Sequence, residues 1–293
     1  MQKTAAVAAS AAFGGGAPLI PAAADCHLPT ACWCVSLGRV NLWQEVVIAA
    51  AAFAAGLINS IAGGGTLVSF PALLWVGRDP VLANATSTVA LWPASLAGAY
   101  GFRREMAGGW RTLLLFAAPS LLGGVLGAVL LLRTPSETFG RLVPFLILFA
   151  TLLLAAQEPI SRRLRGEDGG AHEPTRAWWA GALVFQFLVG VYGGYFGAGI
   201  GILMLAALGL LGFTDIHRMN ALKNLLAICI NGVAAVYFIF SGAVIWSDVL
   251  VMTFAALAGG YSGARLAYRL GRRFVRVAVI IIGLVMSVSL FFK

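Results

Sequence analysis

The chain has 293 residues, of which 60% are hydrophobic and 11% are charged, and its formal net charge is +9. A soluble domain carries roughly 25% charged residues, so this chain has too little polar surface to cover itself in water, and we expect lipid to cover part of it. The positive charge does not indicate a nucleic-acid partner, because the arginines lie at the ends of apolar segments, where they are typical of loops that face the cytoplasm.

Residues 1–43 precede the first apolar segment, and their Ala, Gly and Pro content indicates an N-terminal extension. Residues 1–24 resemble a signal peptide weakly, and whether they are cleaved stays open because glycines interrupt the apolar part. Three cysteines and a histidine cluster in this extension at a spacing that matches no strong metal-site pattern: Cys26, His27, Cys32 and Cys34. We therefore expect no metal and no cofactor.

Ten apolar segments follow the extension. Residues 80–102 and 112–132 carry no charge, and each stretch matches the roughly 20 residues that cross a 30 Å hydrocarbon core as a helix. The 32 uncharged residues 46–77 are too many for one crossing and few for two, so at least one arm should be short or broken. The alternating polarity of barrel strands is absent. The predicted segments are 44–61, 66–77, 81–102, 111–132, 142–157, 177–195, 199–212, 217–240, 248–270 and 274–292.

An internal repeat divides these segments into two halves of five. Gly56, Gly63 and Gly65 recur as Gly190, Gly197 and Gly199, at an offset of 134. At an offset of 136, Asn84 recurs as Asn220, Trp110 as Trp246, and the pair Gly123 and Gly127 as Gly259 and Gly263. The sequence thus predicts an all-α membrane protein with a repeat at 44–157, a cytoplasmic loop at 158–176 and a second repeat at 177–293.

Five segments per half is an odd number, so the two halves should lie in opposite orientations in the membrane. Assigning alternate connections to alternate sides places twelve Lys and Arg residues on one side and six on the other. Basic residues favour the cytoplasmic side, so both termini are predicted to lie outside the cytoplasm of a multi-pass inner-membrane protein. An inverted repeat is typical of secondary transporters.

Glycines break the apolar run after Asn59, at Gly63, Gly64 and Gly65, just before a helix that begins near Thr66. Free backbone N–H groups and a positive helix N-terminus form a site for an anion, and Gly197 and Gly199 supply a second copy. Close helix packing is the alternative explanation for such glycines. It is the one we favour for the small-residue pairs Gly123/Gly127 and Gly259/Gly263.

Polar side chains gather at the start of the third segment of each half: Asn84, Thr86, Ser87 and Thr88 in the first, and Asn220, Lys223 and Asn224 in the second. They either contact a substrate or serve as caps and helix–helix hydrogen bonds. Lys223 either binds an anion or extends its amine to the membrane surface. No acidic residue lies in the middle of a segment and no catalytic constellation emerges, so neither a carboxylate proton relay nor an enzyme is expected.

The sequence resembles the TauE/SafE family of sulfite exporter-like membrane proteins over residues 45–292. The resemblance rests on a glycine block after Asn59, on the run that begins at Phe70 and Pro71, on Ala85, Thr86 and Ser87, and on the second glycine block at 190–199. The second half departs from the pattern, because Lys223 stands where a hydroxyl pair is expected. The resemblance implies transport of small anions such as sulfite or sulfonates.

The sequence therefore predicts an exporter of a small organic or inorganic anion, with an importer on the same fold or a non-transporting membrane protein as alternatives. Substrate, bilayer lipid and, as an open question, further copies of the chain are the expected partners. The predicted substrate-binding residues are Asn59, Gly63, Gly64, Gly65, Thr66, Thr86, Ser87, Gly197, Gly199, Asn220, Lys223 and Asn224.

Overall fold

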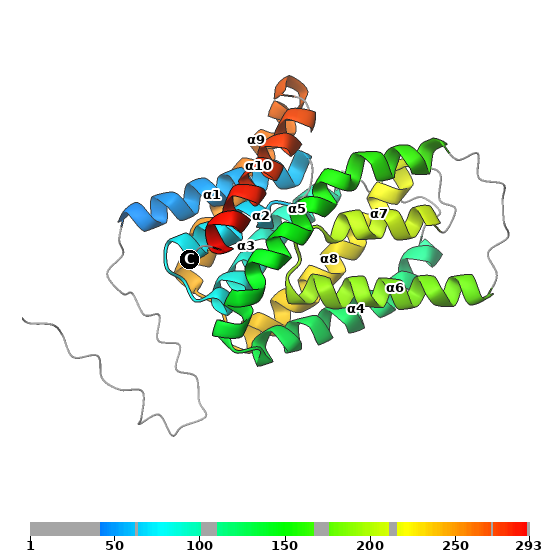
Figure 1. Ribbon diagram of the computed structural model, residues 1–293, viewed down its shortest axis with the longest axis horizontal. Coiled ribbons are helices and arrows are strands. Elements are labelled where there is room, and N and C mark those ends of the chain that lie inside the picture. The colour runs from blue at the N-terminus through cyan, green and yellow to red at the C-terminus, as the bar shows by residue number, and fades with distance from the viewer. Residues whose placement is uncertain are drawn as a thin grey trace, which may run out of the picture. The chain divides into compact units, whose positions relative to one another are not determined.

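The computed structural model describes residues 42–61, 64–100, 110–166, 176–210, 216–270 and 272–291, which form helices with no strand among them (Figure 1). The expected N-terminal extension and its cysteines lie outside the described residues. The first half comprises α1 (Leu42–Ile61), α2 (Thr66–Trp75), α3 (Pro80–Tyr100), α4 (Trp110–Arg133) and α5 (Ser136–Gly166). The second half comprises α6 (Arg176–Tyr195), α7 (Ile200–Leu210), α8 (Ile216–Phe240), α9 (Trp246–Leu270) and α10 (Arg272–Phe291).

Nine of these helices begin and end within two residues of the predicted segments, and α5 differs. It starts six residues earlier than expected and continues to Gly166, into the stretch that was expected to be a loop. The prediction placed its ends at charged residues, but charges at helix ends do not stop a helix. Glu137 and Arg141 in fact form an (i, i+4) ion pair of 2.6 Å in the first turns of α5, and such pairs stabilise helices.

Two of the helices are too short to cross a bilayer. The helices α2 and α7 have 10 and 11 residues, or roughly 15 Å each, about half of the hydrocarbon thickness. The start of α2 lies against the middle of α1, because a β-carbon on Gly65 would overlap the carbonyl oxygen of Ala55. The end of α2 returns to the start of α1, where Gln44 Nε2 donates to the Val76 carbonyl (3.4 Å). The pair α1–α2 is therefore an antiparallel hairpin, and the expected short arm is α2.

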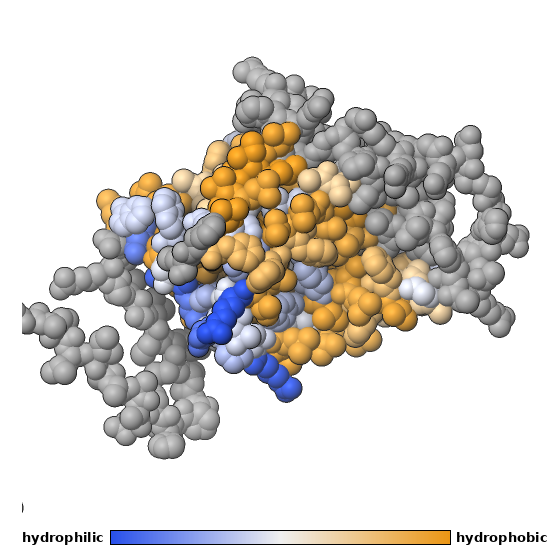
Figure 2. Space-filling model, viewed as in Figure 1, coloured by the Kyte–Doolittle hydropathy of each residue, from blue (hydrophilic) through white to orange (hydrophobic). Residues whose placement is uncertain are grey.

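Apolar side chains cover the outside of the described helices, as expected for a chain that faces lipid. Figure 2 shows hydrophobic residues over much of the coloured face. Exposed large side chains occur on most of the long helices: Leu114, Leu122, Phe145, Val184, Leu188, Phe254, Ile281 and Val285. Within the described part of the chain, four helical stretches are long and apolar enough to cross a membrane: 42–59, 112–133, 136–156 and 221–240. The protein is accordingly a helical, multi-pass membrane protein.

Glycines bring helices of one half into contact with helices of the other. In the pair α1–α9, β-carbons on Gly56 and Gly259 would overlap the carbonyl oxygens of Ala256 and Phe53. In the pair α4–α6, shown side by side in Figure 1, a β-carbon on Gly190 would lie 3.0 Å from the Ser120 carbonyl oxygen, and one on Gly123 would overlap that of Phe187. The two sets of contacts are equivalent in the repeat. Adding 134 to the α1 positions gives the α6 positions, and subtracting 136 from the α9 positions gives the α4 positions. Small residues permit such close backbone approach in membranes.

The helices α3 and α8 pack on each other and on these two pairs, α3 against α9 and α8 against α4. The short helices α2 and α7 pack against the third helix of their own halves, and α5 packs along α10. The same relations thus recur in the two halves for the hairpin, the short helix and the third helix. This arrangement leaves the two glycine-rich breaks, described at 64–65 and 196–199, beside α3 and α8.

Candidate functional site

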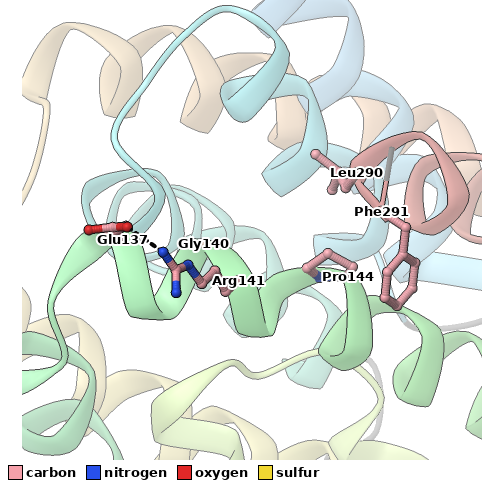
Figure 3. Close-up of a pocket in the computed structure, with 6 residues that line it drawn as sticks. All are labelled: Glu137, Gly140, Arg141, Pro144, Leu290 and Phe291. Carbon is pink, nitrogen blue, oxygen red and sulfur yellow. Dashed lines mark hydrogen bonds and ion pairs between the residues drawn. The ribbon is translucent and has the colours of Figure 1, made fainter. Parts of the chain in front are cut away.

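An open pocket of about 320 Å³ lies between the first turns of α5 and the last turn of α10. Figure 3 shows the ion pair of Glu137 with Arg141 on one side and Leu290 and Phe291 on the other. None of the predicted site residues lines this pocket. Its two charged groups are exposed and satisfy each other, which leaves no free charge there to hold a substrate, so the glycine breaks remain the candidate site.

The break between α6 and α7 is fully described. Gly197 and Gly199 have φ angles of +80° and +78°, which L side chains rarely adopt. The N–H groups of Phe196 and Gly197 both donate to the Tyr192 carbonyl (2.9 and 3.3 Å), which ends α6. The Tyr192 hydroxyl donates to the Ala198 carbonyl (2.8 Å) and fixes the turn. The chain then enters α7 at Ile200, so the positive N-terminal end of α7 lies inside the helical assembly.

The break between α1 and α2 is described from Gly64 onward, and Gly63 lies outside the described residues. Gly64 has a φ of +91°, and a β-carbon there would meet only the Leu67 side chain, at 3.7 Å. Gly65 is buried and precedes Thr66, the first residue of α2, which is half-buried. Both breaks therefore have the helix start that the sequence predicts, and each contains a glycine with a positive φ angle.

Ser87 and Lys223 occupy corresponding places, although they differ in chemistry. Each is the eighth residue of its helix, α3 or α8, about 10 Å from the helix start. Ser87 Oγ lies 2.7 Å from Ser69 Oγ in α2. The alkyl chain of Lys223 lies along the first turn of α7, where a β-carbon on Gly201 would be 3.1 Å from Lys223 Cδ. Each third helix thus packs a polar residue against the first turns of the short helix in its own half.

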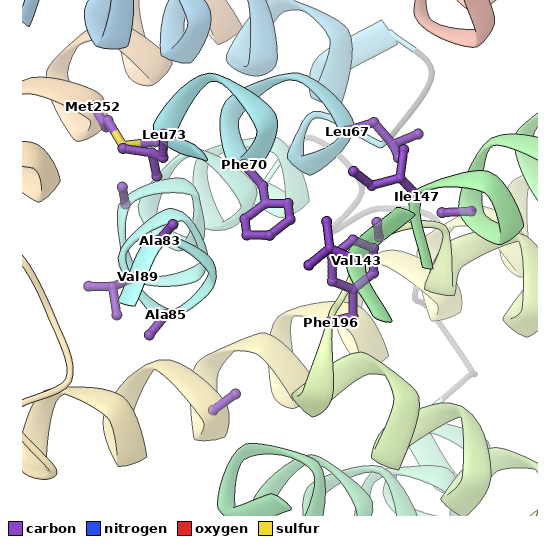
Figure 4. Packing of buried hydrophobic residues seen from close by; sticks show 14 of the residues in the cluster. Leu67, Phe70, Leu73, Ala83, Ala85, Val89, Val143, Ile147, Phe196 and Met252 are labelled. Atoms are coloured by element: carbon purple, nitrogen blue, oxygen red, sulfur yellow. The ribbon is translucent and has the colours of Figure 1, made fainter. Parts of the chain in front are cut away.

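Aromatic rings fill the space between α2 and the second break. The ring of Phe70 in α2 contacts that of Phe196, with centroids 5.5 Å apart, and also that of Phe139 at 6.3 Å. Figure 4 shows Phe70 extending from α2 with Phe196 and Val143 nearby. Phe70 and Phe196 are almost fully buried. The first turns of α2 therefore lie close to the break of the other half, as a shared site requires, with a plug of rings between them.

Other predicted site residues also have protein partners or lack a described side chain. Asn59 Nδ2 donates to Ser95 Oγ (3.2 Å), and the buried Thr86 Oγ1 accepts from the Ile245 N–H (3.1 Å). These contacts favour the structural alternative for Thr86, since its hydroxyl holds the connection between α8 and α9. The side chain of Asn220 lies outside the described residues, and Asn224 is half-buried in α8.

Sequence reasoning missed two contacts between the halves. Asn84 Nδ2 donates to the Tyr195 carbonyl (2.9 Å) at the end of α6, so a residue of the first half contacts the break of the second. Arg78, before α3, forms two hydrogen bonds of 2.8 and 2.9 Å with the buried Asp248 at the start of α9. Asn84 stood in the polar cluster that the sequence revealed, but nothing in the sequence linked it to a residue 111 positions away.

Comparison with known proteins decides the family. A family model described as "Sulfite exporter TauE/SafE" matches residues 48–290. The chain belongs to this family of membrane transporters. The resemblance proposed from the glycine blocks is thus confirmed over both halves.

Curated relatives carry names that agree with this assignment. A "probable membrane transporter protein" of Haemophilus influenzae is 30% identical over 239 residues, 81% of this chain and 91% of the relative. The "probable membrane transporter protein YfcA" of Escherichia coli K12 is 29% identical over 247 residues, which cover 82% and 87% of the two chains. The "probable membrane transporter protein YunE" of Bacillus subtilis is 24% identical over 261 residues, covering 81% and 95%. No solved structure matches the chain.

Proposed function

We propose that this TauE/SafE transporter exports a small anion, such as sulfite or a sulfonate, across the inner membrane. The observation that carries the proposal is the pair of half-length helices, α2 and α7, each of which begins inside the helical assembly after a glycine with positive φ. Their N-terminal ends carry the partial positive charge of the helix dipole, which attracts anions. Ser87 and Lys223, laid against their first turns, would orient the anion.

The proposed site has a net attraction for negative charge, because no carboxylate lies in the middle of α2, α3, α7 or α8. Lys223 adds a full positive charge on the side of α7, where its alkyl chain contacts the Gly201 region. A charge inside a helical span costs on the order of 2.5–3.5 kcal/mol, so a lysine kept at this depth favours an anionic substrate beside it. The predicted inverted arrangement would expose this site to either side in turn.

Export is the proposed direction, because an inside-negative potential favours outward movement of one negative charge by about 2.3 kcal/mol per 100 mV. In the proposed orientation both termini lie outside the cytoplasm, as the distribution of basic residues predicts. Import of a related anion is the alternative, and the same site serves it. Flux measured in both directions distinguishes the two, since an exporter moves the anion faster out of the compartment that corresponds to the cytoplasm.

Flux into and out of proteoliposomes, measured with sulfite, a sulfonate, a carboxylate and chloride, tests this function. Lys223→Ala should weaken anion capture, and Lys223→Arg should retain more of it, because charge rather than shape is the proposed role. Arg141→Ala is the matched control, since this arginine is exposed and pairs with the neighbouring Glu137 on its own helix. Wild-type flux in both Lys223 variants would exclude Lys223 from the site, and no flux with any anion would overturn the proposed function.

A further inference from the structure

Oxygen acceptors gather at the end of α6, on the side of the second break opposite to the start of α7. The C-terminal carbonyls of a helix carry the negative end of its dipole. The Gly197 N–H donates to the Tyr192 carbonyl, five residues back, at 3.3 Å. The Gly193 carbonyl therefore does not receive the N–H that a continuing helix would have given it.

Asn84 adds a buried acceptor whose orientation is fixed. Its side chain is 1% exposed, and Nδ2 donates to the Tyr195 carbonyl (2.9 Å). The opposite orientation of the amide would place Oδ1 against that carbonyl oxygen, where the two would repel. Oδ1 is buried and has no hydrogen-bond partner among the described residues. A buried amide oxygen is costly to leave unpaired, so a ligand is expected there.

Asn231 of α8 brings a second amide oxygen to the same break. A β-carbon on Gly197 would lie 3.6 Å from Asn231 Oδ1 and 3.2 Å from the Gly193 carbonyl oxygen. Both oxygens thus border the small space that the missing side chain of Gly197 leaves free. Asn84 and Asn231 come from α3 and α8, the two helices that pack against each other beside both breaks.

The chemistry of these groups selects the ligand. All are neutral oxygens, and α3, α6 and α8 contain no Asp or Glu. Calcium and magnesium sites in proteins rely on carboxylates, and an amide cannot take up a proton. Broken helices of transporters, in contrast, use C-terminal helix ends and unwound carbonyls to coordinate Na⁺. We propose that the α6–α7 break binds Na⁺ through Asn84 Oδ1, Asn231 Oδ1 and the carbonyls at the end of α6.

This inference builds on the proposed function, because Na⁺ at the end of α6 would lie across the break from the anion at the start of α7. Binding of Na⁺ by itself requires no anion, so it is measured without substrate and without flux. The purified full-length chain in detergent is unfolded by heat in NaCl, KCl or choline chloride at one ionic strength, in a buffer free of candidate substrates. Direct binding of radioactive ²²Na⁺ is measured in parallel.

The unfolding midpoint should rise with Na⁺ and stay constant with choline, because a ligand that binds only the folded state stabilises it. Asn84→Leu should abolish the rise and the ²²Na⁺ binding. Asn231→Leu, which removes the other amide oxygen and leaves the bond from Asn84 to the Tyr195 carbonyl in place, should weaken both. It provides the decisive comparison if Asn84→Leu does not fold.

Gln186→Leu is the matched control, because Gln186 is a buried amide in α6 whose Nε2 already donates to Ser120 Oγ (2.8 Å). It should keep the full Na⁺ response whatever its own stability. Equal midpoints in Na⁺ and choline would overturn the proposal and indicate a water molecule at Asn84 instead. An undiminished Na⁺ response in Asn84→Leu would place the cation elsewhere, and an equal rise with K⁺ would exclude Na⁺ as the specific ligand. None of these results decides whether the protein transports an anion, which the flux experiment tests separately.

Discussion

Trp92 in α3 donates from Nε1 to the carbonyl of Ile228 in α8, over 3.2 Å. The offset of 136 that relates the two halves assigns position 228 to position 92, so α3 and α8 meet at equivalent residues. The indole also lies against Gly232 one turn further along α8, where a β-carbon would be 2.9 Å from Nε1. At this point of the contact between the two third helices, one large side chain packs on one glycine.

We expect Gly232→Ala to destabilise the protein, because its methyl group would push the indole away from the Ile228 carbonyl. Trp92→Phe alone should cost about 1 kcal/mol, the net value of one hydrogen bond. In the double variant the penalty of Gly232→Ala should shrink, because the shorter ring leaves room for the methyl group. Thermal unfolding of the four proteins in detergent measures the coupling, and strictly additive midpoints would contradict this view of the contact.

The sequence predicted the helices well because apolar runs, charges at their ends and the repeat are all local signals. Glycines at 64, 197 and 199 were identified for the same reason, since a break inside an apolar run is visible in the sequence itself. The partners were not predictable. The contacts Asn84–Tyr195 and Arg78–Asp248 join residues 111 and 170 positions apart, and they depend on how helices of different halves cross. Ser87 and Lys223 could be matched only through the offset of the repeat.

The glycines of the break and of the helix contact should respond differently to the same substitution. Gly64→Val should leave most of the protein folded, because the space beside Gly64 is open and the strain at its φ of +91° costs about 1–3 kcal/mol. Flux per folded molecule should be lost if its backbone contacts the anion. Gly127→Val should instead reduce the yield of folded protein, because even a β-carbon would overlap the Val191 carbonyl oxygen in the α4–α6 contact. Normal flux per molecule in Gly64→Val would remove this break from the site.

The ion pair of Arg78 with Asp248 should contribute strongly to folding, because Asp248 is 3% exposed and both its oxygens are bound. Asp248→Asn leaves the guanidinium without its charge partner, and loss of one partner of a buried pair costs about 3–5 kcal/mol. Arg78 is 32% exposed, so the lower end of that range is expected. Arg78→Met with Asp248→Leu should recover part of the stability. Heat-induced unfolding of the single and double variants tests the coupling.

Cysteine labelling tests the orientation in the membrane. In a cysteine-free background, Ser241→Cys should react with a membrane-impermeant reagent added to intact cells, because Ser241 is exposed in the connection between α8 and α9. A cysteine placed in 167–175 should react only after the membrane is opened, since this connection is predicted to be cytoplasmic. The reverse pattern would require both termini to lie inside.

The contacts between α1 and α9 and between α4 and α6 mean that the repeat seen in the sequence is not the mechanical unit of the protein. Each of these pairs consists of one helix from each half. Their backbones are in such close contact that separating them would leave voids. A chain cut within 167–175 should therefore yield two pieces that fold only in each other's presence. Any movement that opens the protein to one side and then the other is therefore expected to keep these two pairs intact.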